Sequence, residues 1–330
     1  MIEEVLSTAR FNPKVDPMLG IWTWEVAVYL FLGGLTAGIL LFIALTHLQG
    51  RQQQRPFTAY RLPLWAPIVL SIGMTTLFLD LEHKLYVFRF FTTLQPTAPM
   101  SWGSWVLILV YPFSILLITA TLRAGYPKLA AWLERLPLVS PLLDLSERYL
   151  RPIAFCTVPV AIALGIYTGI LLSTFGARPF WNSAILGPLF LVSGISAAAA
   201  LIIIGARDKG ERHLFAKMDA GLIAVELLLV GLLIIGLASG GKAQLDALEL
   251  VNGGPYTLLF WGLFVGLGLA VPFVLELWEL RGGRSLVLLA PLLVLLGGYV
   301  LRQVTLDLGQ ASTWHEYTVQ YDPGLLERLR

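Results

Sequence analysis

Eight runs of mostly apolar residues divide this sequence, and each has close to the length that a helix needs to cross a lipid bilayer, about 20 residues. The runs cover residues 22–47, 63–79, 102–122, 152–175, 182–204, 219–238, 256–278 and 285–306. Charged residues make up 13% of the chain, against roughly 25% in soluble domains. The sequence therefore predicts an all-α polytopic membrane protein with eight transmembrane helices surrounded by membrane lipid. Its net charge of +2 gives no argument for a nucleic-acid partner.

The distribution of positive charge predicts which way the spans face. The connections after spans one, three, five and seven hold 14 of the 23 Lys and Arg residues, and the positive-inside rule places such connections in the cytoplasm. Because the number of spans is even, both termini are expected on the outer, periplasmic side of a bacterial or archaeal cytoplasmic membrane. The chain then divides into an outer N-terminal segment (1–21), transmembrane helices one to three (22–123), an inner connection (124–151), transmembrane helices four to eight (152–306) and an outer C-terminal tail (307–330).

The inner connection has a pattern of its own. Its KLAAWLERL segment places apolar residues at helical spacing with charges opposite, which favours a helix lying in the membrane interface. Pro127, Pro137 and Pro141 exclude one continuous helix. An ordinary linker with a single helical turn is the alternative.

Two features inside the spans concern packing. Gly34 and Gly38 form a small-xxx-small pair, which favours close approach of a neighbouring helix. Cys156 lies in an apolar run and is expected to be a small, packed core residue. As the only cysteine, it also excludes an internal disulfide and a cysteine-ligated iron–sulfur cluster in this chain.

A cluster of charge interrupts the apolar sequence between spans two and three. Within LDLEHKLYVFRFF, the residues Asp80, Glu82, His83, Lys84 and Arg89 stand among aromatic residues at the predicted outer surface. One interpretation is a solvated interfacial loop with local salt bridges. The other is one wall of a site where a lipid-soluble redox carrier exchanges protons.

Ionisable residues inside spans are energetically expensive and are functional candidates by default. Glu25 and Arg302 lie near the outer ends of spans one and eight, and Glu226 and Glu276 lie toward the inner side. The alternatives for the first two are snorkelling of Glu25 to the interface and pairing of Arg302 with Asp307. Glu226 and Glu276 are either satisfied polar groups near helix ends or parts of a proton path across the membrane.

The outer ends of several spans bring different chemical groups to one membrane level. Carboxylates, an imidazole, the phenol of Tyr167 and the aromatic segment 101–105 meet there by topology. A quinone site needs such a mixture, because the carbonyl oxygens take hydrogen-bond donors, the protons need carriers and the ring packs on aromatic walls. Haem is not expected, since His47 and His83 lie at opposite membrane faces and the other two histidines lie in loops. We therefore expect a bound quinone, with no haem and no metal in this chain.

Four segments in the same order carry a family resemblance. They are TWEVAVYLFLGGLTAGILL, LDLEHKLYVFRFF with LQPTAPMSWGSW, IYTGILLS with PFWNS, and GGYVLRQVTLDLGQ. Together with the eight spans, they resemble the NrfD/PsrC family, the membrane subunits of polysulfide-reductase-type oxidoreductases. The resemblance implies eight helices in two four-helix bundles and a quinone or quinol bound near the outer surface. It also implies electron exchange with an iron–sulfur subunit docked there, which is usually attached to a molybdenum or tungsten (molybdopterin) catalytic subunit.

The same resemblance suggests roles for single residues. Asp80 matches the family's span-two Asp, Tyr167 matches its span-four Tyr, and Tyr29 falls at or near a polar quinone position in span one. The chain departs from the family after Asp80, where it reads Leu-Glu-His-Lys in place of the common Gly and Pro.

The leading hypothesis is therefore a quinone-reactive membrane subunit that binds menaquinone or ubiquinone near the outer face and acts in catalysis only within a complex. The residues expected to line the quinone pocket are Tyr167, Tyr29, Trp102, Trp105, Arg89 and Arg302. The residues expected to transfer protons are Asp80, Glu82, His83 and Glu25. One alternative is a secondary transporter, against which the nearly bare midplane of the spans argues. The other is a passive anchor for a catalytic complex.

Overall fold

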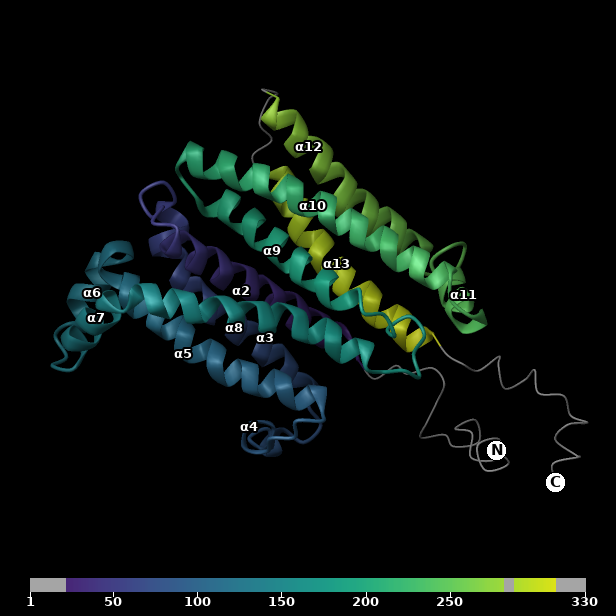
Figure 1. Cartoon of the computed structure of the whole chain (residues 1–330), viewed down its shortest axis with the longest axis horizontal. Coiled ribbons are helices and arrows are strands. Elements are labelled where there is room, and N and C mark those ends of the chain that lie inside the picture. Colours follow the sequence, from purple (N-terminus) through teal and green to yellow (C-terminus); the bar gives the residue numbers. More distant parts are fainter. Residues whose placement is uncertain (1–21, 282–287, 313–330) are drawn as a thin grey trace, which may run out of the picture.

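The protein folds as an assembly of long helices. The computed structural model describes residues 22–281 and 288–312, and within these ranges every regular element is a helix (Figure 1). Eight helical stretches there are long and apolar enough to cross a membrane. The predicted all-α polytopic fold with eight spans is confirmed.

The spans have the following bounds: α2 (Trp24–Leu48), Phe57–Asp80, α5 (Pro99–Gly125), α8 (Leu150–Ser173), α9 (Leu186–Gly205), α10 (Lys209–Ala238), Leu258–Leu280 and α13 (Leu289–Ala311). The second span consists of η2 (Phe57–Arg61), η3 (Leu62–Leu64) and α3 (Trp65–Asp80), and the seventh of η5 (Leu258–Ala270) and α12 (Val271–Leu280). The connections carry η4 (Lys84–Tyr86), α4 (Arg89–Thr92), α6 (Pro127–Leu133), α7 (Val139–Arg148) and α11 (Lys242–Glu249).

Two spans begin six or more residues before the apolar runs that predict them. The second span starts at Phe57, in a π-helical turn, and the sixth starts at Lys209, ten residues before the predicted first residue Asp219. The early start of α10 has a clear cause, because the Asp208 side chain accepts a hydrogen bond from the Glu211 amide at 2.7 Å and caps the helix. Asp219 therefore lies well inside the helix.

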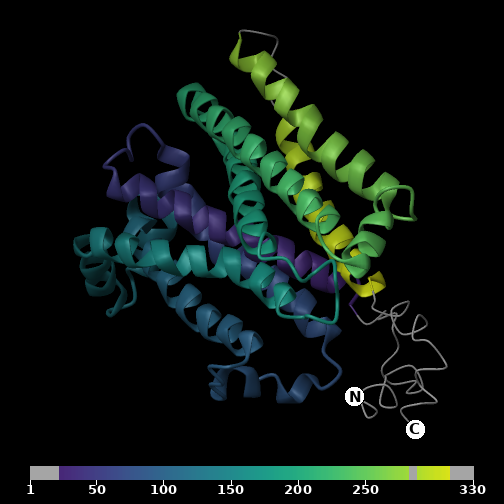
Figure 2. The same cartoon turned by 45° about the vertical axis from the view of Figure 1, so that its right-hand side comes forward.

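For description, we divide the eight spans in chain order into a first helix set (α2, the second span, α5 and α8) and a second helix set (α9, α10, the seventh span and α13). In the first set α2 packs on α3 and α8, and α5 packs on α8; in the second set α10 packs on α9 and α12, and α13 packs on η5 and α9. Figures 1 and 2 show the purple-to-blue helices on one side and the green-to-yellow helices on the other. The two sets are in close contact, because α2 packs on α9 and α13 and α8 packs on α9.

The contact between α2 and α9 depends on glycine. A Cβ atom on Gly38 would lie 2.5 Å from the carbonyl oxygen of Gly194 and 2.7 Å from the Cβ of Ala198, so no larger residue fits without moving a helix. A Cβ atom on Gly34 would meet Arg302 and Gly194. The predicted role of the Gly34 and Gly38 pair in helix packing is confirmed. Cys156, in contrast, is exposed on α8, and its predicted place in the core is wrong.

The described residues begin and end at the same end of the assembly. The Trp22 backbone N–H donates to the Gln310 side-chain oxygen at 2.9 Å, and the Gln310 amide donates to the Trp22 carbonyl oxygen at 2.8 Å. We call this the terminal end and the other the opposite end. The side of the membrane that each end faces stays a prediction, with the terminal end outside.

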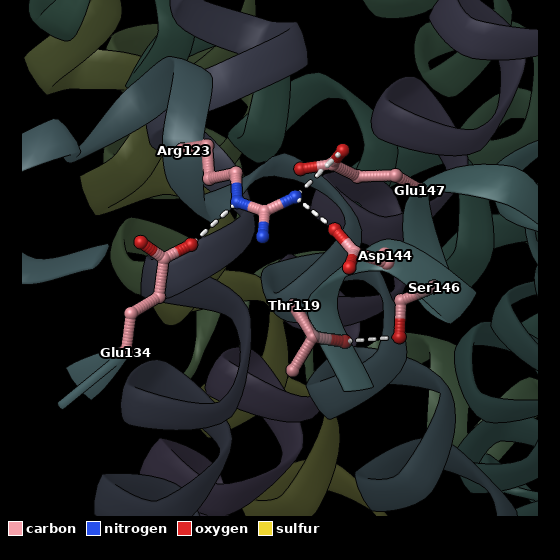
Figure 3. A network of polar contacts seen from close by, with 6 residues as sticks. All are labelled: Thr119, Arg123, Glu134, Asp144, Ser146 and Glu147. Carbon is pink, nitrogen blue, oxygen red and sulfur yellow. Dashed lines mark hydrogen bonds and ion pairs between the residues drawn. The ribbon is translucent and has the colours of Figure 1, made fainter. Parts of the chain in front are cut away.

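The connection between α5 and α8 lies at the opposite end and contains two short helices. The segment KLAAWLERL forms α6 in its first part, and the amphipathic α7, which was not predicted, follows it. One guanidinium ties them to α5: Arg123 bonds Glu134 at 2.6 Å, Asp144 at 2.6 Å and Glu147 at 3.2 Å (Figure 3).

The Gly38 contact predicts a position-dependent effect of a single methyl group. Gly38→Ala is expected to destabilise the protein by about 1–3 kcal/mol, because the methyl group enters a packed backbone contact. Gly33→Ala is the matched control on the same helix, since nothing lies within 4 Å of its added Cβ. Thermal unfolding of the full-length protein in detergent measures both. Equal effects of the two substitutions would contradict the close contact.

The Arg123 network predicts that one side chain holds α7 on α5. Arg123→Gln is expected to speed hydrogen–deuterium exchange of the α7 backbone amides, because three carboxylates lose their shared cation. Arg135→Gln is the control, since this arginine is exposed on the same connection. Unchanged exchange of α7 in the Arg123 variant would show that apolar packing alone holds the helix.

Candidate functional site

A cavity of about 200 Å³ opens at the terminal end of the first helix set. Its lining is predominantly apolar and comes from α2, α3, α5 and α8, with further contributions from the segment after α3 and from α13. The lining residues are Trp22, Val26, Tyr29, Leu30, Met74, Leu77, Phe78, Asp80, Leu81, Val87, Phe90, Phe91, Met100, Gly103, Ser104, Leu107, Tyr167, Leu171, Leu172 and Leu306. Such a chamber suits a flat, apolar ring that carries a few polar atoms.

Two phenols and one carboxylate supply polar chemistry in this cavity. The hydroxyl groups of Tyr29 on α2 and Tyr167 on α8 are hydrogen-bonding neighbours. Tyr167 can reach this position because Gly103 lies opposite it on α5, where a Cβ would clash with the phenol ring. Asp80 is the last residue of α3 and stands in the wall as the helix ends. Because one phenol donates to the other, the cavity offers one free phenol O–H and one proton-accepting group to a ligand.

Trp22 closes one side of the cavity and is fixed by two sets of contacts. Its indole packs on Trp181, with ring centroids 5.4 Å apart, and meets Phe175 edge-on at 5.7 Å. The Gln310 side chain holds its backbone, as described above. Trp181 is itself anchored, because its ring N–H donates to the Thr305 carbonyl oxygen at 2.7 Å. The aromatic wall is therefore built on α13 and on the connection between α8 and α9.

A second hollow of about 560 Å³ adjoins the cavity at the connection between α3 and α5. It shares Leu81, Phe90 and Met100 with the cavity wall. Its other lining residues are Glu82, His83, Tyr86, Arg89, Thr93, Gln95 and Ser101. The Arg89 guanidinium stacks on the Tyr86 ring at 4.5 Å. This hollow places charged and polar side chains next to the cavity.

The structure brings together only part of the predicted site. Three of the predicted residues, Asp80, Tyr29 and Tyr167, line one cavity. Glu82, His83 and Arg89 line the neighbouring hollow instead. Glu25 accepts a hydrogen bond from the Thr23 hydroxyl and lies close enough to Asp80 for their charges to interact.

The two tryptophans on α5 lie away from the cavity lining. The Trp102 ring N–H donates to the Pro96 carbonyl oxygen at 2.7 Å, and Trp105 is exposed. The helix turns Gly103 and Ser104 toward the cavity in their place. The aromatic walls come from residues that the sequence did not single out, namely Trp22, Phe90 and Phe91.

The predicted place of Arg302 in the quinone pocket is corrected. Its guanidinium points into the contact between α13 and α9, where it donates to the Ser193 hydroxyl at 2.5 Å and to the Phe190 carbonyl oxygen at 2.8 Å. The alternative partner Asp307 is wrong too, because Asp307 accepts hydrogen bonds from the Gln303 amide. Arg302 is 1% exposed, and the Phe190 ring covers it.

The two glutamates considered for a proton path are buried in the second helix set. Glu226 lies beside Arg302 and Ser193, and Glu276 lies beside Asp219. The sequence did not single out Asp219, which accepts a hydrogen bond from Ser196 at 2.5 Å. The expectation of a nearly bare midplane is therefore wrong, and it no longer argues against a transporter.

Comparisons with known proteins distinguish a subunit of an oxidoreductase complex from a transporter. The family model described as "Polysulphide reductase, NrfD" matches residues 13–313. One chain of the polysulfide reductase of Wolinella succinogenes is 29% identical over 88% of this sequence and 94% of its own length. Protein NrfD of Escherichia coli is 32% identical over 88% of this sequence and 96% of its own. One subunit of the selenate reductase of Mesobacillus selenatarsenatis is 24% identical over 93% and 80%.

The family model covers all of the described residues, including the lining of the cavity and the buried polar groups of the second helix set. The eight spans and the resemblance seen in the four sequence segments agree with this match. The protein is integral to the membrane and belongs to the NrfD family.

Proposed function

We propose that this protein is the quinone-reactive membrane subunit of a multi-subunit oxidoreductase. The observation that carries the proposal is the cavity in which Tyr29, Tyr167 and Asp80 meet within aromatic and aliphatic walls. Relatives whose names describe them as parts of polysulfide and selenate reductases support the assignment to an oxidoreductase complex. The outer iron–sulfur subunit and the molybdenum or tungsten catalytic subunit are part of this proposal.

The residues of the cavity fit a quinone head group. A quinone ring is flat and apolar at its faces and carries two carbonyl oxygens, so it needs apolar walls and a few well-placed donors. The Tyr167 hydroxyl would donate to one carbonyl oxygen, and Tyr29 would hold the Tyr167 phenol in place. Bound quinol supplies two electrons and two protons to the complex, and bound quinone accepts them.

Asp80 is suited to take or give the proton at the quinone oxygen. It lies in the cavity wall where α3 ends, and the next residue, Leu81, borders both the cavity and the second hollow. A proton on Asp80 can therefore pass to Glu82 or His83 in that hollow and on to water. Electrons leave or arrive through the partner at the same end, and the potential of the catalytic partner sets their direction.

The hydrogen bond from Tyr167 predicts a modest loss of affinity. Tyr167→Phe is expected to weaken binding of a quinol-site inhibitor about 2- to 12-fold, because one hydrogen bond contributes roughly 0.5–1.5 kcal/mol. Tyr111→Phe is the matched control, since this phenol bonds Ser71 outside the cavity. Inhibitor fluorescence on the purified full-length protein measures both. If the wild type binds neither quinol nor inhibitor, the protein is a passive anchor.

The proton-transfer role of Asp80 predicts a loss of electron transfer with little change in inhibitor binding. Asp80→Asn is expected to lower quinol-linked electron transfer of the assembled complex about 100-fold or more, because general acid–base catalysis contributes on the order of 10²–10⁴. Inhibitor binding should change little. Asp246→Asn, on α11 at the same end, is the control. Full turnover in the Asp80 variant would remove this residue from the site.

A further inference from the structure

A hollow of about 420 Å³ lies at the opposite end of the assembly, where α2 and α7 end and α8 begins. Much of its lining consists of side chains that can bind a ligand through charge or hydrogen bonds. The lining residues are His47, Leu48, Gln49, Gly50, Gln52, Glu147, Arg148, Leu150 and Arg151. None of them lines the quinone cavity, so this hollow is a separate feature of the protein.

His47 brings a ring nitrogen without a partner to this hollow. The residue is only 5% exposed. Its Nε2 lies 3.1 Å from the carbonyl oxygen of Ala59, and since a carbonyl oxygen only accepts, Nε2 carries the ring proton and donates. Nδ1 of the neutral ring is then an acceptor, and no described residue donates to it. Because a buried acceptor without a partner costs free energy, this atom favours a ligand that brings a donor group.

Two arginines supply positive charge to the hollow. Within residues 22–281 and 288–312, neither Arg148 nor Arg151 forms an ion pair. The Arg148 guanidinium lies over the Tyr149 ring at 5.9 Å. Glu147 also lines the hollow, but its carboxylate accepts a hydrogen bond from Arg123 at 3.2 Å (Figure 3). The charged residues of the lining thus carry one net positive charge, which matches the single negative charge of a phosphodiester.

An exposed apolar face of α8 continues from the hollow toward the middle of the membrane. Phe155 follows Arg151 by four residues, so both lie on one side of the helix, and Phe155 is 69% exposed. Pro152 and Pro159 are exposed as well. Basic pockets between transmembrane helices bind the headgroups of anionic lipids. The hollow and this face together offer charge to a headgroup and apolar surface to the acyl chains.

We propose that this hollow binds an anionic phospholipid with a hydroxyl group in its headgroup, of the phosphatidylglycerol type, on the side of the membrane predicted to be inner. The phosphodiester oxygens accept hydrogen bonds from the guanidinium groups of Arg148 and Arg151. A headgroup hydroxyl donates to Nδ1 of His47, and the acyl chains lie along Phe155. Lipids with choline or ethanolamine headgroups have no net charge, so they leave the positive charge of the lining unbalanced.

Native mass spectrometry of the full-length protein in detergent, titrated with one lipid at a time, tests the proposal. Phosphatidylglycerol is expected to bind about tenfold or more tightly than phosphatidylcholine. Arg148→Gln and Arg151→Gln are each expected to weaken phosphatidylglycerol binding about tenfold or more, because a hydrogen bond to a charged group is lost. Arg207→Gln is the matched control, since this arginine is exposed between α9 and α10, outside the hollow. Unchanged affinity in both hollow variants, or an equal loss in the control, would overturn the proposal.

The His47 contact has its own readout. Phosphatidylethanol has the same charged phosphodiester but no headgroup hydroxyl. The wild type is expected to bind phosphatidylglycerol about 2- to 12-fold more tightly than phosphatidylethanol, because one hydrogen bond is gained, and His47→Phe should remove this preference. Equal binding of the two lipids by the wild type would overturn the contact. If His47→Phe fails to fold, as circular dichroism would show, the comparison of lipids on the wild type still decides.

Competition distinguishes a lipid from a free anion. Glycerophosphoglycerol, which is the headgroup without acyl chains, is expected to displace bound phosphatidylglycerol about 100-fold less effectively than the intact lipid does, because it lacks the apolar contacts with α8. Equally effective displacement by this compound or by inorganic phosphate would overturn the assignment to a lipid. None of these measurements uses quinone, so their failure leaves the proposed quinone site standing.

Discussion

The close contact between α2 and α9 is the interaction on which the rest of the arrangement depends. Helices in lipid gain little from burying apolar side chains against one another, so backbone-to-backbone packing through small residues carries much of their association. Gly38 and Gly194 allow that packing here. Because α2 belongs to one helix set and α9 to the other, the contact makes a single body of both. It also brings the Arg302 side chain against Gly34, and a larger residue at position 34 would displace the guanidinium.

This arrangement places polar groups in two sites that differ in how far water reaches them. At the first cavity, Asp80 is the last residue of α3 and is partly exposed, next to the second hollow. In the second set, Arg302 is fully desolvated and is stabilised by the Ser193 hydroxyl, two backbone carbonyl oxygens and the Phe190 ring. A buried positive charge held in this way stabilises the ionised form of a neighbouring carboxyl group.

Apolar runs predict the spans well, because the thickness of the bilayer directly constrains their length. They predict the starts of spans poorly, since a helix continues into water when its first turn is capped. The sequence pattern Asp208-x-x-Glu211 carried that signal for α10, and reading it would have placed Asp219 inside the membrane. Tyr29, Tyr167 and Asp80 were found through topology and family resemblance. Trp102 and Arg302 were misplaced because position along a helix does not say which way a side chain points.

The distance between the two sites decides how one could influence the other. The cavity and the buried carboxyl groups of the second helix set share no described polar contact, but Arg302 lies about one turn from the cavity wall at Leu306. Two unit charges ~10 Å apart interact by roughly 1.7 kcal/mol at an effective dielectric constant near 20. A change of one charge at the cavity would then change the electrostatic energy at Arg302 by roughly that amount, which exceeds the 1.4 kcal/mol that is a factor of ten in an equilibrium constant. Electrostatics through Arg302 is therefore sufficient to couple the sites without any movement of the helices.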